Sequence, residues 1–325
     1  MRVFLVALLV LVAGLAAILL WGPREPVDAE IGFDPQILPA DAAELDGWLA
    51  TREAEVPNLR PDDAKQIRWN GAPGARTPLA IVYLHGFSAS QAEIRPVPDN
   101  VAAALGANLY FARLSGHGRD GPAMAEPAAG DWIADTAEAL AIGRRIGERV
   151  LVISTSTGGT LAALAAVDPS LSEDLAGMVF VSPNFRIANP LAGLLTLPYA
   201  RHWMPLAQGA ERGFDPLNDD HAAHWTTRYP SVAAVPLAAL VAHVGALDYA
   251  QAEVPALFVY SRADQIVAAE ATDAVHDTWG GPVARELIEP DGTGDPANHL
   301  IAGDILSPGR TERVSQRIID WASAL

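Results

Sequence analysis

The sequence of 325 residues contains no cysteine. This absence excludes disulfides, thiolate metal sites and a cysteine nucleophile, but it leaves the redox compartment open because disulfide-free proteins occur everywhere. Basic residues are also few, since 22 Lys and Arg stand against 39 Asp and Glu, and the formal net charge is −17. Without a basic patch, nucleic acid is not an expected partner. No glycine-rich dinucleotide-binding turn opens a helix, so no cofactor is expected.

Residues 3–21 form a long unbroken hydrophobic run. A run of about 19 apolar residues can cross a bilayer core as a helix. Arg2 precedes it and Arg24 follows among acidic residues, which favours the N-terminus inside and the main body on the extracytoplasmic side. A cleaved signal peptide, giving a secreted or periplasmic protein, is the alternative, but the small residues at 14–16 lie well inside the run. We therefore expect 1–22 to be a transmembrane anchor or signal segment, with anchoring favoured.

The remaining chain alternates predicted strands and helices. Half of all residues are apolar, enough for a sizeable core. We expect a linker and short helix over 23–64 and one α/β domain over 65–325, with a helical insertion at about 183–251. Such alternation predicts a mostly parallel sheet with helices on both faces and a ligand site at the carboxyl ends of the strands. Strands are expected at 65–69, 79–84, 108–113, 150–153, 177–182, 255–260 and 283–288. Helices are expected at 42–54, 131–149, 157–167, 191–199, 235–244, 268–279 and 311–325.

Residues 150–162 read as an apolar strand, an abrupt turn and an alanine-rich helix, with Ser156 at the apex of the turn. This turn strains the apex residue and requires small neighbours, which Gly158 and Gly159 supply on the helix side. Ser154 stands where the pattern G-x-S-x-G has its first glycine. The strained turn would expose the Ser156 hydroxyl beside the free N–H groups of the helix. Clusters of Ser, Thr and Gly are also common at strand ends, so this motif alone does not decide the function.

Other residues that could act with a serine nucleophile lie in loops that follow predicted strands. They are the His-Gly-Phe motif at 85–87, Asp264 and His299. The chain order Ser, Asp, His, each past a strand, is that of the α/β-hydrolase fold. Over about 65–325 the sequence resembles an α/β-hydrolase of the serine carboxylesterase and monoacylglycerol-lipase-like kind. This resemblance implies a helical lid and a serine hydrolase that cleaves carboxylic esters through an acyl-enzyme.

The chemistry explains why these residue types are needed. A serine hydroxyl is a poor nucleophile at neutral pH until a neighbouring imidazole takes its proton. His299 would act as this base toward Ser156, and Asp264 would hold the imidazole in the right tautomer and stabilise its charged form. By resemblance to the family, the backbone N–H groups of Phe87 and Thr157 would form the oxyanion hole.

Other residues compete for these roles. Asp291 and Asp295 lie in the same loop as His299, and we expect them to shape that loop. The strand at 177–182 ends without a carboxylate, which favours Asp264 as the acid. The remaining serines near the motifs are weaker candidates because they do not occupy the apex: Ser88, Ser90 and Ser154.

Four other histidines are expected to be structural: His85, His117, His221 and His224. The first two lie in glycine-rich loops that they can brace. The last two have loose metal-ligand spacing, but we expect the aspartates at 219–220 to cap a helix there instead of binding a metal. No metal site is expected.

Three functions remain open. An ester hydrolase is favoured. Its substrate is expected to be a small neutral ester with a short-to-medium acyl chain, and its other partner is the membrane, through the N-terminal helix. A peptidase or thioesterase could use the same triad, and an aminopeptidase would need acidic groups such as Asp219, Asp220 or Glu253. A catalytically silent binding module on the same fold is the third. The insertion supplies apolar side chains that could line an acyl pocket, although most should pack on the body: Leu191, Leu194, Leu195, Leu197, Trp203, Met204, Trp225, Leu237, Leu240 and Val241.

Overall fold

A seven-stranded sheet forms the centre of the computed structural model, which describes residues 2–325. The strand order is β1-β3-β2-β4-β5-β8-β9, and every neighbouring pair is parallel except the antiparallel edge pair of β1 and β3. The strands are β1 (Gln66–Arg68), β2 (Thr77–Leu84), β3 (Asn108–Phe111), β4 (Gly147–Thr155), β5 (Leu175–Val181), β8 (Ala256–Tyr260) and β9 (Val283–Leu287). The predicted mostly parallel sheet is therefore present.

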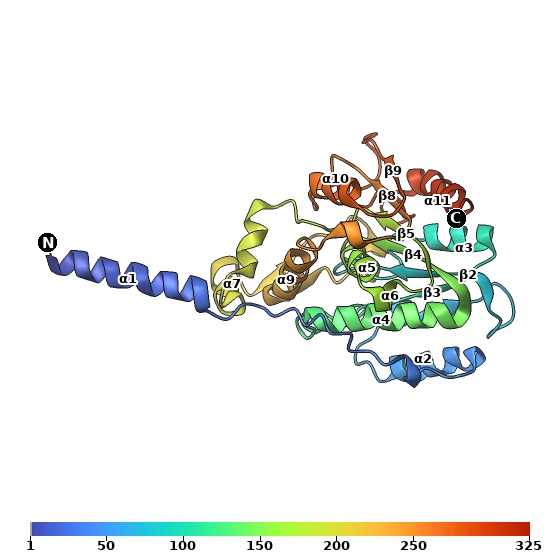
Figure 1. The fold of residues 1–325 in the computed structure, drawn as a ribbon, viewed down its shortest axis with the longest axis horizontal. Helices are drawn as coiled ribbons and strands as arrows, with labels where there is room; N and C mark the ends of the chain where they lie inside the picture. The colour runs from blue at the N-terminus through green and yellow to red at the C-terminus, as the bar shows by residue number, and fades with distance from the viewer. Residues whose placement is uncertain (1) are drawn as a thin grey trace.

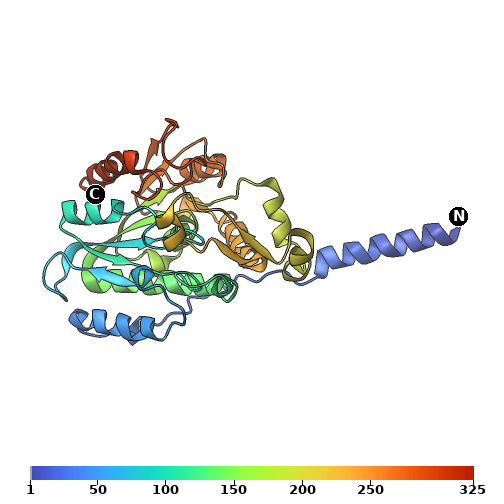
Figure 2. The same cartoon turned by 180° about the vertical axis from the view of Figure 1, so that it is seen from behind.

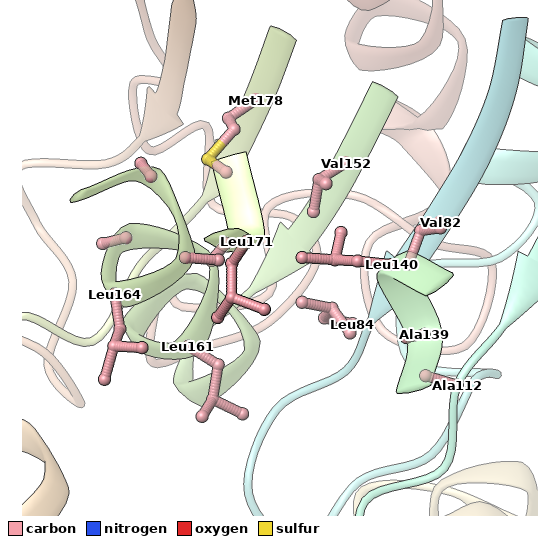
Figure 3. Packing of buried hydrophobic residues seen from close by; sticks show 14 of the residues in the cluster. Val82, Leu84, Ala112, Ala139, Leu140, Val152, Leu161, Leu164, Leu171 and Met178 are labelled. Atoms are coloured by element: carbon pink, nitrogen blue, oxygen red, sulfur yellow. The ribbon is translucent and has the colours of Figure 1, made fainter. Parts of the chain in front are cut away.

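Helices cover both faces of this sheet, as the apolar strands require. Along β2, Val82 and Leu84 face one hydrophobic cluster, whereas Ile81 and Tyr83 face the other. Figure 3 shows the first cluster, where Val82 and other strand residues gather about Leu140. That face is covered by α4 (Ala129–Ile146), α5 (Thr157–Val167), α6 (Pro169–Ser172), α9 (Ala234–Val244) and α10 (Ala269–Thr278). The opposite face is covered by α3 (Val97–Leu105) and α11 (Pro308–Ala322), which lie side by side in Figures 1 and 2.

Helix boundaries differ slightly from those predicted. Helix α4 begins two residues earlier than expected, and Asp131 lies inside its first turn, where its carboxylate accepts the N–H of Ala128 at 2.8 Å. Asp131 therefore stabilises the start of α4 from the third position of the helix, not from the position before it. Helix α11 begins at Pro308, because proline suits the first turn, where its missing N–H is not needed.

The N-terminal hydrophobic run forms α1 (Arg2–Trp21), with a mean hydropathy of 3.2 and no buried residue. Among residues 2–325 it is the one helix long and apolar enough to cross a membrane, a property that an N-terminal signal sequence shares. Figures 1 and 2 show it projecting away from the body beside α7 (Ala200–Gln208).

The segment expected as a linker packs partly on the body through α2 (Leu45–Ala54). Leu45 and Leu49 are buried in the larger core cluster. Glu53 of the same helix accepts two hydrogen bonds, both 2.7 Å, from the guanidinium of Arg113, and both side chains are buried. Breaking one partner of such a buried pair is costly, so this contact holds α2 in place.

The segment between β5 and β8, where a helical insertion is expected, contains several helices and a small hairpin. It comprises the 3₁₀ helix η5 (Pro190–Thr196), α7, α8 (Asp219–His224), α9 and the antiparallel strands β6 (Glu211–Gly213) and β7 (Arg228–Pro230). The region expected as a helix at 191–199 is largely this 3₁₀ helix. The hairpin escaped prediction because each strand is three residues long and lacks apolar alternation.

Candidate active site

Ser156 has the strained backbone conformation predicted for the turn between β4 and α5. Its φ and ψ are 51° and −115°, a region that non-glycine residues rarely adopt. Neighbouring backbone holds it there. The Ser156 N–H donates to the carbonyl oxygen of Val181 at 3.1 Å, and the Asn184 N–H donates to the Ser156 carbonyl at 2.9 Å. Such over-determined strain is typical of functional positions.

Small residues flank this turn because the backbone passes so close. A Cβ atom on Gly158 would lie 2.1 Å from the carbonyl oxygen of Leu84, and one on Gly159 would lie 2.7 Å from the Cβ of Pro183. Ser154 replaces the usual first glycine without a clash. Its buried hydroxyl donates to the carbonyl oxygen of Val179 on β5 at 2.9 Å.

This packing predicts that Gly158→Ala will destabilise the protein. The added methyl group must displace the backbone of Leu84, and such overpacking typically costs about 1–3 kcal/mol. Gly309→Ala in α11 is the matched control, because nothing lies within 4 Å of its Cβ position and alanine favours a helix. Urea unfolding of both variants measures the difference. Equal free energies of unfolding would contradict the prediction.

Asp264 and His299 form a hydrogen-bonded pair at the same edge of the sheet. The Nδ1–H of His299 donates to Oδ2 of Asp264 at 2.8 Å, and the Asp264 side chain is only 1% exposed. The other carboxylate oxygen of Asp264 accepts the backbone N–H groups of Ile266 at 2.8 Å and Val267 at 3.0 Å. The loop after β8 therefore orients the carboxylate toward the imidazole.

The competing aspartates contact other groups. Asp295 accepts the backbone N–H of His299 at 3.0 Å, not its ring. Asp291 pairs with Arg310 at 2.5 Å, and this hydrogen bond holds the pKa of Asp291 well below its usual range. Both aspartates thus shape the loop that carries His299, as expected, while the ring contacts Asp264.

The surroundings of His299 favour its protonated form. Burial is the largest single influence and lowers the pKa of the imidazole, but the nearby acidic groups together outweigh it and raise the pKa above 6.5, with Asp264 contributing most through its charge and hydrogen bond. Glu93 and Asp295 raise it further. Within residues 2–325 the ring makes no hydrogen bond to the Ser156 hydroxyl, and such bonds often tighten only when substrate binds. A base that gains a proton readily suits the expected chemistry.

The His-Gly-Phe loop after β2 passes directly beside Ser156. A Cβ atom on Gly86 would lie 3.0 Å from the Cβ of Ser156, so the backbones are in close approach. Among the described residues, the backbone N–H groups of Phe87 and Thr157 donate no hydrogen bond. Neither N–H group expected in the oxyanion hole is therefore used in a hydrogen bond within the described chain. The Phe87 ring packs edge-on against three aromatic rings, at centroid distances of 5.6, 6.1 and 5.5 Å: His117, Trp132 and Tyr229.

His85 and His117 brace this loop. His85 is fully buried; its Nδ1–H donates to the carbonyl oxygen of Gly86 at 2.8 Å, and its Nε2 accepts the N–H of Leu114 at 3.1 Å. Burial lowers the pKa of His85 to about 4, so the ring is neutral. His117 contacts the Ser115 carbonyl at 3.0 Å and lies 5.1 Å from His85 between ring centroids.

The prediction that aspartates cap the helix before His221 and His224 was wrong. Asn218 is the cap of α8 and accepts the N–H of His221 at 2.8 Å. Asn218, Asp219 and Asp220 are all of types that favour the first position before a helix, so the sequence alone does not show which of them is the cap. His224 instead contacts Asp63, with 2.8 Å between Nδ1 and Oδ1. In the described part of the chain, no group of three or more His, Asp or Glu residues could hold a metal ion.

The acidic residues considered for binding a substrate amine lie on the surface. Asp219 and Asp220 are exposed on α8. Glu253 is exposed and precedes β8, at the amino ends of the strands and thus at the opposite edge from Ser156. Sequence reasoning instead missed Glu93, a buried carboxylate that accepts the Gly86 N–H at 2.7 Å. The available signal was that Glu93 is the one acidic residue between positions 85 and 98.

Comparisons with known proteins agree with this architecture. A solved structure of LipS and LipT, two metagenome-derived lipolytic enzymes, has a TM-score of 0.65 at 21% identity, covering 82% of this chain and all of the other. A Paleococcus ferrophilus monoacylglycerol lipase has a TM-score of 0.57 at 13% identity, covering 80% and 98%. A soluble variant of Saccharomyces cerevisiae monoglyceride lipase with a substrate analogue has a TM-score of 0.60 at 11% identity, covering 80% and 91%.

No curated protein matches the sequence. Residues 76–289 match the family described as serine aminopeptidase, S33, and the match spans most of the sheet domain. The structural neighbours share its fold at low identity. The chain belongs to the serine aminopeptidase S33 family and has the α/β-hydrolase fold, the fold expected from its sequence.

Proposed function

We propose that this protein is a serine hydrolase that cleaves carboxylic esters through an acyl-enzyme. Its catalytic triad is Ser156, Asp264 and His299, and the N–H groups of Phe87 and Thr157 form the oxyanion hole. The observation that carries this proposal is the strained Ser156 turn at the same sheet edge as the hydrogen-bonded Asp264–His299 pair. Such geometry matches a nucleophile, a base and an orienting acid.

The reaction follows from these contacts. The Ser156 hydroxyl attacks the ester carbonyl as His299 takes its proton, and Asp264 stabilises the resulting imidazolium. The oxyanion is held by the two backbone N–H groups, each of which is worth about 3 kcal/mol in comparable sites. His299 then gives its proton to the leaving alcohol. Water, activated by the same imidazole, releases the acid and restores Ser156.

Ester cleavage is favoured over the alternatives by two observations. The structural neighbours are described as lipolytic enzymes and as monoacylglycerol or monoglyceride lipases. The exposed acidic residues Asp219, Asp220 and Glu253 give no support for an amine-binding site. The family description names aminopeptidases, so peptide cleavage remains the second candidate, and thioester cleavage uses the same chemistry.

The apolar side chains of the insertion range from buried to exposed, and Leu197 and Trp203 are half-buried. Most of those singled out in the sequence are buried, either against the body or within the insertion itself (about 183–251), which we call the lid: Leu195, Met204, Trp225, Leu237, Leu240 and Val241. By contrast, Leu191 is 59% exposed and Leu194 is 46% exposed, and nearby Leu206 on α7 is 88% exposed. These three leucines give the lid an apolar outer surface that is suited to lipidic substrates.

The chain leaving α1 is attached to this lid. The Tyr199 N–H donates to the carbonyl oxygen of Pro23 at 2.9 Å. Arg201 forms a two-bond ion pair with Glu25, at 2.6 and 2.5 Å, and the Glu25 side chain is only 7% exposed. If α1 spans a bilayer, these contacts hold the exposed leucines of the lid near the membrane surface. We therefore propose that 1–22 anchors an extracytoplasmic body (23–64 and 65–325); removal of a signal segment is the alternative.

The substrate class is tested with nitrophenyl esters whose acyl groups run from two to sixteen carbons, alongside aminoacyl amides. We expect kcat/KM to rise through short and medium chains, because each buried methylene adds about 0.8 kcal/mol until the pocket is full. A flat response to chain length with faster amide cleavage would instead favour the peptidase.

The membrane attachment predicts different behaviour for two chains. The full-length protein should sediment with membranes and resist high salt, because salt weakens electrostatic but not hydrophobic attachment. A chain that begins at Pro23 keeps the Glu25–Arg201 contact and should be soluble and active. If expression of the full-length chain instead gave a soluble protein that lacks the N-terminal segment, this result would indicate signal cleavage.

A further inference from the structure

Glu93 is a buried carboxylate in the loop that carries the proposed oxyanion donor. It is 3% exposed, and its Oε2 accepts the Gly86 N–H at 2.7 Å. Gly86 immediately precedes Phe87, whose N–H is the proposed donor. A Cβ atom on Gly86 would lie 2.5 Å from Oε1 of Glu93 and 3.0 Å from the Cβ of Ser156, so only glycine fits between them. Glu93 and Ser156 therefore both lie close against Gly86.

The same carboxylate is tied to the strand that ends in Ser156. The Tyr83 hydroxyl donates to Oε2 of Glu93 at 3.0 Å, and it lies 3.1 Å from the Thr155 hydroxyl. Tyr83 comes from β2, and Thr155 is the residue before Ser156. One carboxylate oxygen thus joins the oxyanion loop to both strands that frame the nucleophile.

Glu93 forms no ion pair in the described part of the chain, and His299 acts on it only through its charge. No lysine or arginine pairs with it among residues 2–325, which is unusual for a buried carboxylate. The titratable groups that act on it are Tyr83 and His299; Asp264 and Asp295 act in turn on His299. Burial raises the pKa of Glu93 to about 7, while the Gly86 N–H, His299 and Tyr83 oppose this rise. Glu93 also raises the pKa of His299.

We propose that Glu93 is a positioning residue: its carboxylate aligns the Gly86–Phe87 backbone for the oxyanion, and its charge stabilises the His299 imidazolium. Glu93 would thus complement Asp264. Asp264 orients the His299 ring by a hydrogen bond, whereas Glu93 orients the backbone that carries the oxyanion donor. This proposal rests on the proposed serine hydrolase function.

Two consequences separate this role from simple packing. If Glu93 is replaced by glutamine, the pKa of His299 should fall, because a nearby negative charge is lost. The acid limb of kcat/KM, set by protonation of the base, should then move to lower pH. The maximal kcat should fall by about tenfold to a hundredfold with little change in KM, because small misplacement of catalytic groups has effects of this size.

The experiment compares Glu93→Gln, Glu93→Asp and Glu138→Gln with the wild type. Glu93→Asp keeps the charge but shortens the reach, so it should retain the wild-type acid limb while kcat stays low. Glu138 is also buried, but it pairs with Lys65 elsewhere. Its replacement should leave the pH profile unchanged. NMR titration of the His299 ring, assigned with His299→Gln, measures its pKa without requiring activity. Failure of the proposed function can therefore be distinguished from failure of the proposal for Glu93.

Tyr83→Phe keeps the proposal testable if Glu93→Gln does not fold. Loss of the Tyr83 donor should raise the pKa of Glu93, so activity should fall near neutral pH and recover as Glu93 ionises at higher pH. An unmoved His299 titration in Glu93→Gln would overturn the proposal, even with a lower kcat. A pH profile of Tyr83→Phe that matches the wild type would overturn it as well.

Discussion

Replacing His299 with glutamine is expected to lower kcat by about 10⁶-fold, the size of the loss when the triad histidine of a serine protease is removed. Glutamine can still occupy the space beside Asp264, but it cannot take the proton from Ser156. Steady-state hydrolysis of the best nitrophenyl ester measures the loss. The free energy of unfolding should change far less, because the imidazole makes one side-chain hydrogen bond in the described chain.

His224→Gln is the matched control for this experiment. His224 also pairs with an aspartate, Asp63, at 2.8 Å, but it lies on the insertion and has no proposed role in the reaction. Its replacement should leave kcat within a few-fold of the wild type. Similar losses in both variants would indicate that histidine replacement acts through folding, and would contradict the assignment of His299 as the base.

Asp264→Asn is expected to lower kcat by about 10⁴-fold, as in the worked serine-protease case. Asparagine fits the same loop, but its amide no longer selects the His299 tautomer with hydrogen on Nδ1. The pKa of His299 should also fall, because the charge of Asp264 is the largest influence raising it. The acid limb of kcat/KM in Asp264→Asn should accordingly shift to lower pH.

Asp291→Asn provides the comparison for the acid. Asp291 lies in the His299 loop but pairs with Arg310, and its side chain does not contact the imidazole. We expect kcat near that of the wild type. An inactive Asp291→Asn or Asp295→Asn protein, together with a nearly normal Asp264→Asn protein, would show that Asp264 is the wrong acid.

The sheet could be predicted from sequence because its strands are short apolar runs. β2, β4, β5 and β8 lie between two helical layers, so both faces of each strand are apolar. The strand ends then brought Ser156, Asp264 and His299 to one edge in the expected chain order. Asp264 and His299 lie within hydrogen-bond distance there, and their catalytic roles stay a prediction.

Other features depend on contacts between distant segments, which local patterns do not reveal. Glu53 and Arg113 lie 60 residues apart in sequence, so nothing near α2 indicated that it would dock through a buried ion pair. Likewise, the role of Glu93 depends on Tyr83 and the closeness of Gly86 to Ser156. The attachment of Glu25 to Arg201 joins the N-terminal segment to the lid across 176 positions.

The insertion also contacts the loop that carries the proposed oxyanion donor Phe87. The Thr226 N–H donates to the carbonyl oxygen of Ser88 at 2.7 Å, and Tyr229 packs on Phe87. The insertion is therefore fixed to the proposed oxyanion loop on one side and to the segment after α1 on the other. Changes in the lid should affect both substrate preference and the alignment of the Phe87 N–H.

Labelling with a fluorophosphonate probe tests the central claim most directly. An activated serine displaces fluoride and forms a stable bond to phosphorus, so labelling reports the nucleophile without knowledge of the substrate. We predict that mass spectrometry will find the label on Ser156, that Ser156→Ala will abolish labelling while the protein remains folded, and that Ser154→Ala will retain it. Full labelling of folded Ser156→Ala, or a wild-type protein that never reacts, would contradict the assignment of Ser156 as the nucleophile.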